Sequence, residues 1–252
     1  MKLPWPSSVC SWIVRYWRYA QVRSSVRPSA GRPSTPDRIQ LYSLPTPKGV
    51  KASIMLEETC LPYEAHLVSF GSDDQMTPEF LSLNPNNKIP AMIDPDGPGG
   101  NPMPLWESGA ILIYLAEKTG TLIPTDPVER YQCLQWLMFQ MGGVGPMFGQ
   151  LGHFYKFAAD KITDAYPTDR YLNESKRLLG VLEGRLSGRD YIMGSEYTIA
   201  DIAAAPWVRT LTNTYDAGDD LGLDEFANVV AWRDRVLSRP SVEKGLNMPP
   251  RP

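Results

Sequence analysis

The chain has 252 residues and an ordinary globular composition, with 42% hydrophobic and 21% charged residues. This length suits one large domain or two small ones, and no apolar run approaches the roughly 20 residues of a membrane span. The net charge is −3, and +6 of it lies in residues 1–36, which leaves −9 elsewhere and argues against nucleic-acid binding. Three cysteines without CxxC spacing and two histidines predict no metal site and no disulfide framework.

The first 36 residues differ from the rest of the chain. Their apolar residues fall on one face of a helix, and residues 27–36 are rich in proline, serine and arginine, as in a flexible linker. We expect residues 1–37 to form a basic, disordered extension, or to come from an upstream start codon and be seldom made. The alternative is a membrane-surface helix or an organelle transit peptide. We therefore expect a cytoplasmic protein, or an organelle protein if this segment is a transit peptide.

From Ile39 the pattern changes to short strands and helices. The sequence predicts strands at 39–43, 63–68, 91–94 and 103–106, and helices at 49–60, from 77 onward and at 107–118. Lys51, Glu57 and Glu58 are expected on the outer face of the first helix. The order β-α-β-α-β-β-α predicts that residues 38–122 form a small α/β domain with one parallel crossover and one hairpin.

Beyond a linker at residues 121–127, the remaining segments are predicted to be helical. The predicted helices span 129–141, 170–186, 199–208 and 227–237. The first of them is expected to end at the Gly-Gly pair of residues 142–143. A capping signal, Thr198-Ile-Ala-Asp201, stands at the start of the third. We expect residues 128–252 to form an all-helical domain.

Two stretches of the α/β region indicate a binding site. Residues 84–91 (Asn-Pro-Asn-Asn-Lys-Ile-Pro-Ala) run from a polar turn into a proline that opens a strand. The residue before a proline is held extended, which leaves the N–H and C=O of Ile89 free to pair. Glu107 and Ser108 open a helix, whose unpaired N–H groups and partial positive charge make an anion site. Together they suit a small peptide-like ligand with a free amine and a free carboxylate.

By these residues the chain resembles the glutathione transferases, and more narrowly their Nu class, which is known for disulfide-bond reductase activity. The similarity covers residues 38–252 and is carried by Leu44-Pro-Thr-Pro-Lys-Gly49, Asn86-Asn-Lys-Ile-Pro90, Leu105-Trp-Glu-Ser-Gly-Ala-Ile111 and Gln140-Met-Gly-Gly-Val-Gly-Pro-Met147. The resemblance implies a thioredoxin-like α/β domain followed by an all-α domain. It also implies a homodimer that uses glutathione as co-substrate and needs no metal.

The resemblance assigns roles to particular residues. The Ile89-Pro90 bond would be cis, and the isoleucine backbone would pair with the cysteinyl part of glutathione. Glu107 would pair with the γ-glutamyl amine, while the Ser108 hydroxyl and the helix N–H groups would take the carboxylate. The implied glutathione-binding residues are Gln75, Lys88, Ile89, Pro90, Glu107, Ser108 and, from the helical domain, Arg170.

Several of these residues have simpler structural interpretations. Glu107 is also explained as a carboxylate that favours the positive end of the helix dipole, and Gln75 as a solvated loop residue. Arg170 could pair with Glu174 across one helical turn. An aromatic and methionine-rich set is expected to divide between the core and a second-substrate pocket: Phe139, Met141, Met147, Phe148, His153, Phe154, Tyr155 and Phe157.

The sulfur site lacks a protein thiol. A thioredoxin carries paired cysteines after its first strand, but residues 44–48 read Leu-Pro-Thr-Pro-Lys, so the nucleophile would be the sulfur of glutathione. A free thiol with a pKa near 8.5 is mostly protonated at pH 7, and the catalytic task is to hold it as thiolate. We assign that task to Thr46 and Lys48. Lys48 replaces the asparagine usual in the Nu class, and it could equally point to solvent. Tyr42 and Ser43 are interpreted as strand-packing residues.

The sequence thus predicts a glutathione-dependent transferase or disulfide-bond reductase that uses a bound glutathione thiolate as nucleophile. Its second substrate would be an electrophilic or disulfide small molecule. One alternative is a non-catalytic glutathione-binding regulatory protein, for which the departure at Lys48 is the only hint. Another is a glutathione-dependent lyase that opens an ether. The sequence does not distinguish the second substrate.

Overall fold

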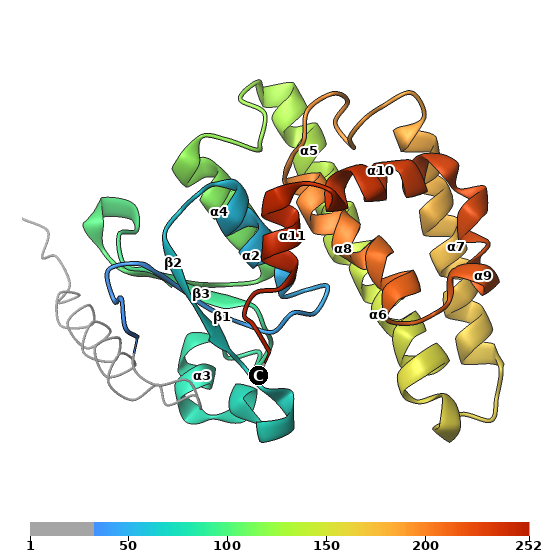
Figure 1. Ribbon diagram of the computed structural model, residues 1–252, viewed down its shortest axis with the longest axis horizontal. Coiled ribbons are helices and arrows are strands. Elements are labelled where there is room, and N and C mark those ends of the chain that lie inside the picture. The colour runs from blue at the N-terminus through green and yellow to red at the C-terminus, as the bar shows by residue number, and fades with distance from the viewer. Residues whose placement is uncertain (1–32, 252) are drawn as a thin grey trace, which may run out of the picture.

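A computed structural model of the protein describes residues 33–251 (Figure 1). Most of the predicted N-terminal extension, including its amphipathic face, lies outside the described residues. Its last residues contact the fold, because the main-chain N–H and hydroxyl groups of Ser34 and Thr35 donate hydrogen bonds of 2.8–3.0 Å to the carboxylate of Glu64. Desolvation raises the pKa of Glu64, but these four bonds outweigh it and lower that pKa to about 2.

The α/β region contains a four-stranded mixed sheet in the order β2-β1-β3-β4. β1 (Ile39–Ser43) pairs in parallel with β2 (Tyr63–Leu67) and antiparallel with β3 (Ala91–Asp94), which pairs antiparallel with β4 (Met103–Trp106). The predicted crossover and hairpin are both confirmed. The α/β fold class is confirmed with them.

Helices cover both faces of this sheet. α2 (Val50–Glu58) and α4 (Ser108–Thr119) pack on one face, where Leu41 and Met92 join the main core. The short helix α3 (Pro78–Leu83), capped by the Thr77 hydroxyl, lies over the other face, where Tyr42 and Ile93 form a second cluster. The alternation of adjacent strand residues between two clusters follows from the period of two along a strand.

The prediction of an outer face on α2 was wrong. Lys51 is 1% exposed, and the whole run from Val50 to Leu56 is buried, because α2 is covered by α4, α8 (Ile199–Asn213) and α11 (Pro240–Leu246) as well as by the sheet. The side chains of Glu57 and Glu58 are also largely covered. Glu58 is paired with Arg239 and Glu57 with Lys244.

The rest of the chain is helical, as predicted, with α5 (Pro127–Phe139), α6 (Gly145–Gly152), α7 (Tyr166–Leu186), α9 (Gly218–Leu221) and α10 (Ala227–Leu237) beside α8 and α11. The predicted helix end at residues 142–143 was wrong. The chain continues through a π-helical turn, η4 (Gln140–Val144), into α6, and a second such turn, η5 (His153–Phe157), follows. Packing of this segment against α5, α7 and α8 overrides the weak helix propensity of glycine.

The last helix returns to the sheet layer, where it lies against α2 (Figure 1). The approach is close, since a Cβ on Gly245 would stand 2.6 Å from the Cα of Ile54, so only glycine fits. The Ser53 hydroxyl donates to the Gly245 carbonyl at 2.6 Å. α11 thereby holds the α/β layer and the helical bundle together around α2. Short 3-10 turns complete the chain: η1 (Phe70–Ser72), η2 (Asp74–Met76), η3 (Pro98–Gly100), η6 (Ala159–Lys161) and η7 (Leu223–Glu225).

Candidate functional site

Strand register brings most of the predicted site residues to one end of the sheet. Tyr42 pairs with Ala91, and Ala91 pairs with Trp106, so the loop after β1, the residues before β3 and the start of α4 lie side by side. β2 runs parallel to β1 and ends at the same edge, with Leu67 opposite Ser43, and the segment that carries Gln75 leaves from there. Residues that are far apart in the sequence therefore face one region.

The loop after β1 presents a hydroxyl that is free to donate. The backbone N–H of Gly49 donates to Thr46 Oγ1 at 3.2 Å, which leaves the Thr46 hydroxyl proton available for another acceptor. The loop leads into the N-terminus of α2, where the N–H groups of Gly49, Val50 and Ala52 are paired within the chain, so only the positive end of the helix dipole favours an anion. Lys48 is exposed at this turn. Tyr42 and Ser43 are buried strand residues, as predicted.

The Ile89-Pro90 peptide bond is cis, as the resemblance implied. Asn84 positions the turn before it, because its Nδ2 donates to the Lys88 carbonyl and its Oδ1 accepts from the Asn86 N–H at 2.9 Å. The Ile89 side chain is buried in the smaller cluster, but its backbone N–H and C=O make no hydrogen bond within the described part of the chain. An open backbone donor and acceptor thus stand at this edge. The Lys88 side chain is exposed.

The start of α4 presents a carboxylate beside free helix N–H groups. Glu107 precedes the first helical residue with φ 70° and ψ 114°, a sparsely populated conformation that is often retained at ligand sites. Its side chain is exposed and caps nothing. Ser108 is buried, and its hydroxyl donates to Met141 Sδ at 3.7 Å.

Gln75 offers a buried acceptor without a partner. It lies in η2, where its Nε2 donates only weakly to Asp73 at 3.4 Å. Its Oε1 is buried and accepts no hydrogen bond from any described residue. Because buried polar atoms in folded proteins are nearly always paired, this atom fits a site that is completed by an N–H donor from a ligand.

Three residues that adjoin this region were not among the predicted catalytic or glutathione-binding residues: Lys51, Gln140 and Met141. The Lys51 ammonium donates to Gln140 Oε1 at 2.7 Å and to Met141 Sδ at 3.5 Å. Burial lowers the pKa of Lys51 to about 7. The signal for its position was present, since every other residue from 50 to 56 is uncharged.

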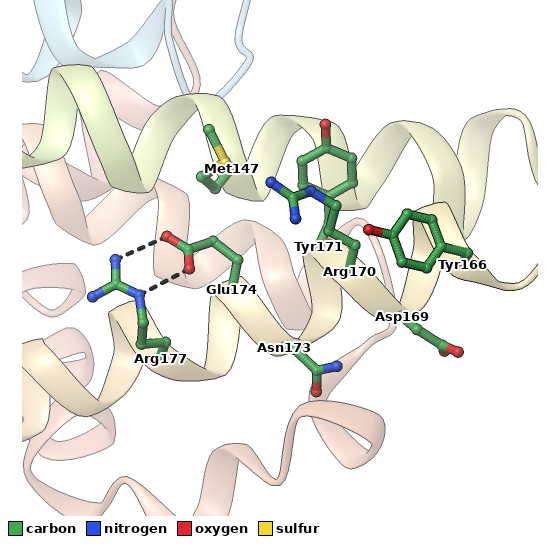
Figure 2. A pocket seen from close by; sticks show the side chains of 8 residues that line it. All are labelled: Met147, Tyr166, Asp169, Arg170, Tyr171, Asn173, Glu174 and Arg177. Atoms are coloured by element: carbon green, nitrogen blue, oxygen red, sulfur yellow. Dashed lines mark hydrogen bonds and ion pairs between the residues drawn. The ribbon is translucent and has the colours of Figure 1, made fainter.

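Arg170 does not join the other predicted residues. It lines a separate cleft of about 650 Å³ between α6 and α7, together with Met147, Tyr166, Tyr171 and Arg177 (Figure 2). The predicted alternative, an ion pair with Glu174, is not formed. Glu174 instead pairs with Arg177 through two hydrogen bonds of 2.8 Å. The Arg170 guanidinium has no hydrogen bond or ion pair to a described residue, so it is available to an anion.

Only one member of the aromatic and methionine-rich set, Phe148, is a fully buried core residue, and a second-substrate pocket lined by the others stays a prediction. Of the others, Met147 lines the Arg170 cleft and Phe157 is exposed. Within residues 33–251 no cluster of side chains is suited to a metal ion. None of the helices in that range has the length and apolar character needed to cross a membrane.

A mixed thioredoxin-like sheet joined to a helical bundle, with an open cis-proline edge beside a helix start, defines a class of glutathione-binding proteins. The chain belongs to the glutathione S-transferase family. Residues 47–118 match the N-terminal domain of glutathione S-transferases, and residues 146–240 match their C-terminal domain.

Individual relatives agree over most of their length. The chain is 44% identical over 209 residues to the disulfide-bond oxidoreductase YfcG of Escherichia coli, covering 82% of this chain and 94% of that protein. A glutathione transferase from Burkholderia graminis, crystallised with two glutathione molecules per subunit, is 62% identical with a TM-score of 0.86, over 87% and 92% of the two chains. One from Pseudomonas putida, crystallised with one glutathione disulfide per subunit, is 61% identical with a TM-score of 0.84, over 86% and 94%.

Proposed function

We propose that the protein is a Nu-class enzyme that reduces small disulfides with glutathione. The observation that carries this proposal is the open backbone pair of Ile89 beside the Glu107–Ser108 helix start, in a fold with no cysteine in the loop that directly follows the first strand. Similarity to a disulfide-bond oxidoreductase and to transferases with bound glutathione or glutathione disulfide supports it.

The site residues suit the parts of glutathione one by one. Ile89, held by the cis bond to Pro90, would pair with the cysteinyl backbone, and Glu107 with the γ-glutamyl amine. Ser108 and the first N–H groups of α4 would hold the γ-glutamyl carboxylate. Gln75 Oε1 would accept from an N–H of the ligand, and the exposed ammonium of Lys88 would lie near its glycyl carboxylate.

Thr46 would hold the glutathione sulfur as thiolate. Its hydroxyl proton is free and the positive end of the α2 helix dipole lies beside it, and both favour an anion. The bound thiolate attacks one sulfur of the substrate disulfide, forms a mixed disulfide with it and releases the other half as a thiolate. A second glutathione thiolate then attacks the mixed disulfide, giving glutathione disulfide and the second substrate thiol.

The Arg170 cleft is the best candidate for the second glutathione. Two guanidinium groups, Arg170 and Arg177, line it beside the aromatic rings of Tyr166 and Tyr171. Only Arg170 lacks a carboxylate partner, so it would contact a carboxylate of the incoming tripeptide. Arg170→Gln is expected to raise the KM for glutathione while leaving binding of the first molecule unchanged.

Variants of Lys48 test whether the protein is an enzyme or a non-catalytic regulatory protein. If its ammonium approaches the sulfur, Lys48→Asn and Lys48→Ala both raise the pKa of the bound thiol, seen in a titration of thiolate absorbance. If Thr46 acts alone, Lys48→Ala titrates like the parent. A faster Lys48→Asn variant would show that the lysine hinders activation and would favour a regulatory role.

We also propose a homodimer built on α5. Exposed apolar side chains stand along that helix at Val128, Tyr131 and Met138, and Trp106 is exposed at the end of β4. A stripe of this kind is typical of an interface. Tyr131→Glu is expected to give a monomer by sedimentation, whereas Phe157→Glu, a change at another exposed apolar residue, is not.

Turnover assays test the proposed function directly. The purified protein is given glutathione with hydroxyethyl disulfide, an aryl halide or a peroxide, and disulfide reduction is expected to be fastest. Thr46→Val should lose about a hundredfold in kcat, the low end for loss of a catalytic hydrogen-bond donor, while Thr46→Ser keeps most of it. Glutathione binding without turnover of any substrate would favour the regulatory alternative. An aryl ether cleaved faster than any disulfide would favour a lyase.

A further inference from the structure

Lys51 is a buried cation in a place that does not favour one. It is the second residue of α2, where the partial positive charge of a helix N-terminus disfavours an ammonium group. Its hydrogen bonds go to a neutral amide oxygen of Gln140 and to the thioether of Met141. Among residues 33–251 no carboxylate lies within ion-pair distance of its Nζ. Buried ammonium groups are normally paired, so Lys51 lacks a counter-charge.

Met141 joins Lys51 to the start of α4. Its sulfur accepts from Lys51 Nζ at 3.5 Å and from Ser108 Oγ at 3.7 Å, so the ammonium and the hydroxyl contact the same atom. The Met141 side chain also lies against Gly109, where a Cβ would stand 3.2 Å from Met141 Cγ. An anion held by Ser108 and the N–H groups of α4 would therefore place its charge close to Lys51.

We propose that Lys51 is the counter-charge for the γ-glutamyl carboxylate of the bound ligand, and that it takes up a proton when this carboxylate arrives. The inference rests on the proposed function, because it takes the carboxylate to lie at the start of α4. Lys51 acts on this carboxylate across Met141 and Ser108. It is thus a positioning residue for the ligand's charge and does not contact the reacting sulfur.

The surrounding charges determine the direction of the effect. Burial lowers the pKa of Lys51 to about 7, Lys48 adds to the lowering, and Glu107 opposes it. The turn η4 adds only uncharged groups. Other charged or titratable residues on the elements packed against α2 are Tyr42 of β1, Tyr114, Glu117 and Lys118 of α4, Asp201 and Arg209 of α8, and Glu243 and Lys244 of α11. A ligand carboxylate added to this setting favours the ammonium form.

Calorimetry with S-methylglutathione tests the proposal, because this ligand has no thiol to ionise. Titrations at pH 7 in two buffers of different ionisation enthalpy give the number of protons that are taken up for each ligand bound. We expect uptake of about half a proton, the amount for a group whose pKa starts near the working pH and rises. S-methyl-(4-aminobutyryl)cysteinylglycine, which lacks the γ-glutamyl α-carboxylate, is expected to bind without this uptake. Equal uptake with both ligands would overturn the assignment.

Two variants separate charge from structure. Lys51→Arg keeps a cation that does not deprotonate, so it should bind S-methylglutathione without proton uptake. Any proton exchange by the ligand's own amine persists in this variant and can be subtracted. Lys51→Met should bind about tenfold more weakly than the parent at pH 6.5 and nearly equally at pH 9, where the parent's lysine is neutral. A purely structural role would weaken binding by the same factor at both pH values.

The outcomes remain distinguishable if the variants do not fold. The two-ligand comparison uses only the parent protein and decides the assignment by itself. Binding of S-methylglutathione without proton uptake overturns the role of Lys51 and leaves the proposed site standing. No binding of S-methylglutathione at all overturns the proposed site, and this inference with it.

Discussion

Two buried charges stand near the starts of two helices, and they are treated in opposite ways. Asp201 is the third residue of α8 and accepts four hydrogen bonds, from Ile192 N–H, Trp232 Nε1 and both the N–H and the hydroxyl of Thr198, at 2.8–3.1 Å. Lys51 near the start of α2 has one neutral oxygen and one sulfur. The helix dipole favours the first charge and disfavours the second.

We interpret the difference as that between a structural charge and one that serves ligand binding. Burial raises the pKa of Asp201, but donors within the protein bond to both of its carboxylate oxygens, so the carboxylate needs no further partner. Lys51 has no counter-charge among the described residues, and it lies beside the proposed ligand site. A buried charge that is fully paired is accounted for by the fold, whereas a buried charge without a counter-charge beside a site is a candidate for pairing with a ligand.

The comparison predicts the largest effect at Asp201. Asp201→Ala leaves the donors of Ile192, Trp232 and Thr198 buried and unpaired, and should cost about 3–5 kcal/mol in the free energy of unfolding. Urea denaturation measures it. Asp201→Asn, which still accepts through one oxygen, should cost less. A loss below about 1 kcal/mol for the alanine variant would show that the network is not structural.

Lys51 should instead destabilise the free protein in a pH-dependent way. Its pKa falls from 10.5 to about 7 on folding, so between these values the unfolded chain binds more protons. Stability therefore rises with pH above 7, by up to about 1.4 kcal/mol per pH unit from this residue. Urea denaturation from pH 6 to 9 without ligand should show this slope, and Lys51→Met should remove it. Parallel profiles would mean that Lys51 is satisfied in the free protein after all.

Glu107 tests the site that Lys51 is proposed to serve. Glu107→Gln should weaken glutathione binding by about 1.5–3 kcal/mol, the scale of a charged hydrogen bond. Glu129→Gln is the matched control, because Glu129 is also an exposed acid near a helix start, in the first turn of α5 and away from the site. If calorimetry finds the same glutathione affinity in the two variants, the only role left for Glu107 is its favourable interaction with the helix dipole.

The smallest effect is expected at the N-terminal edge. A chain that starts at Pro33 should keep the fold and activity, since it retains Ser34 and Thr35 on Glu64. A chain that starts at Asp37 loses these bonds and should lose less than about 1 kcal/mol, because the contact is partly exposed to solvent. The lowered pKa of Glu64 makes this contribution present above pH 4.5 and lost as the pH falls towards 2. Loss of soluble dimer in the Pro33 chain would show that residues 1–32 are needed.

Local patterns in the sequence determined most of the secondary structure. The bounds of β1, β3, β4 and α10 agree with the prediction, because alternation of period two and helical spacing are properties of neighbouring residues. The capping box at Thr198 and the capped start of α3 follow from the same local chemistry. The open backbone of Ile89 followed from the proline after it.

Tertiary packing decided the rest, since a sequence shows which residues are polar but not what surrounds them. Lys51 is buried because α4, α8 and α11 enclose α2 on the sides that the sheet leaves open. Residues 142–143 stay helical because neighbouring helices hold them, and Arg170 is left unpaired because Glu174 pairs with Arg177. The contact of Met141 with both Lys51 and Ser108 joins three segments that no local pattern connects.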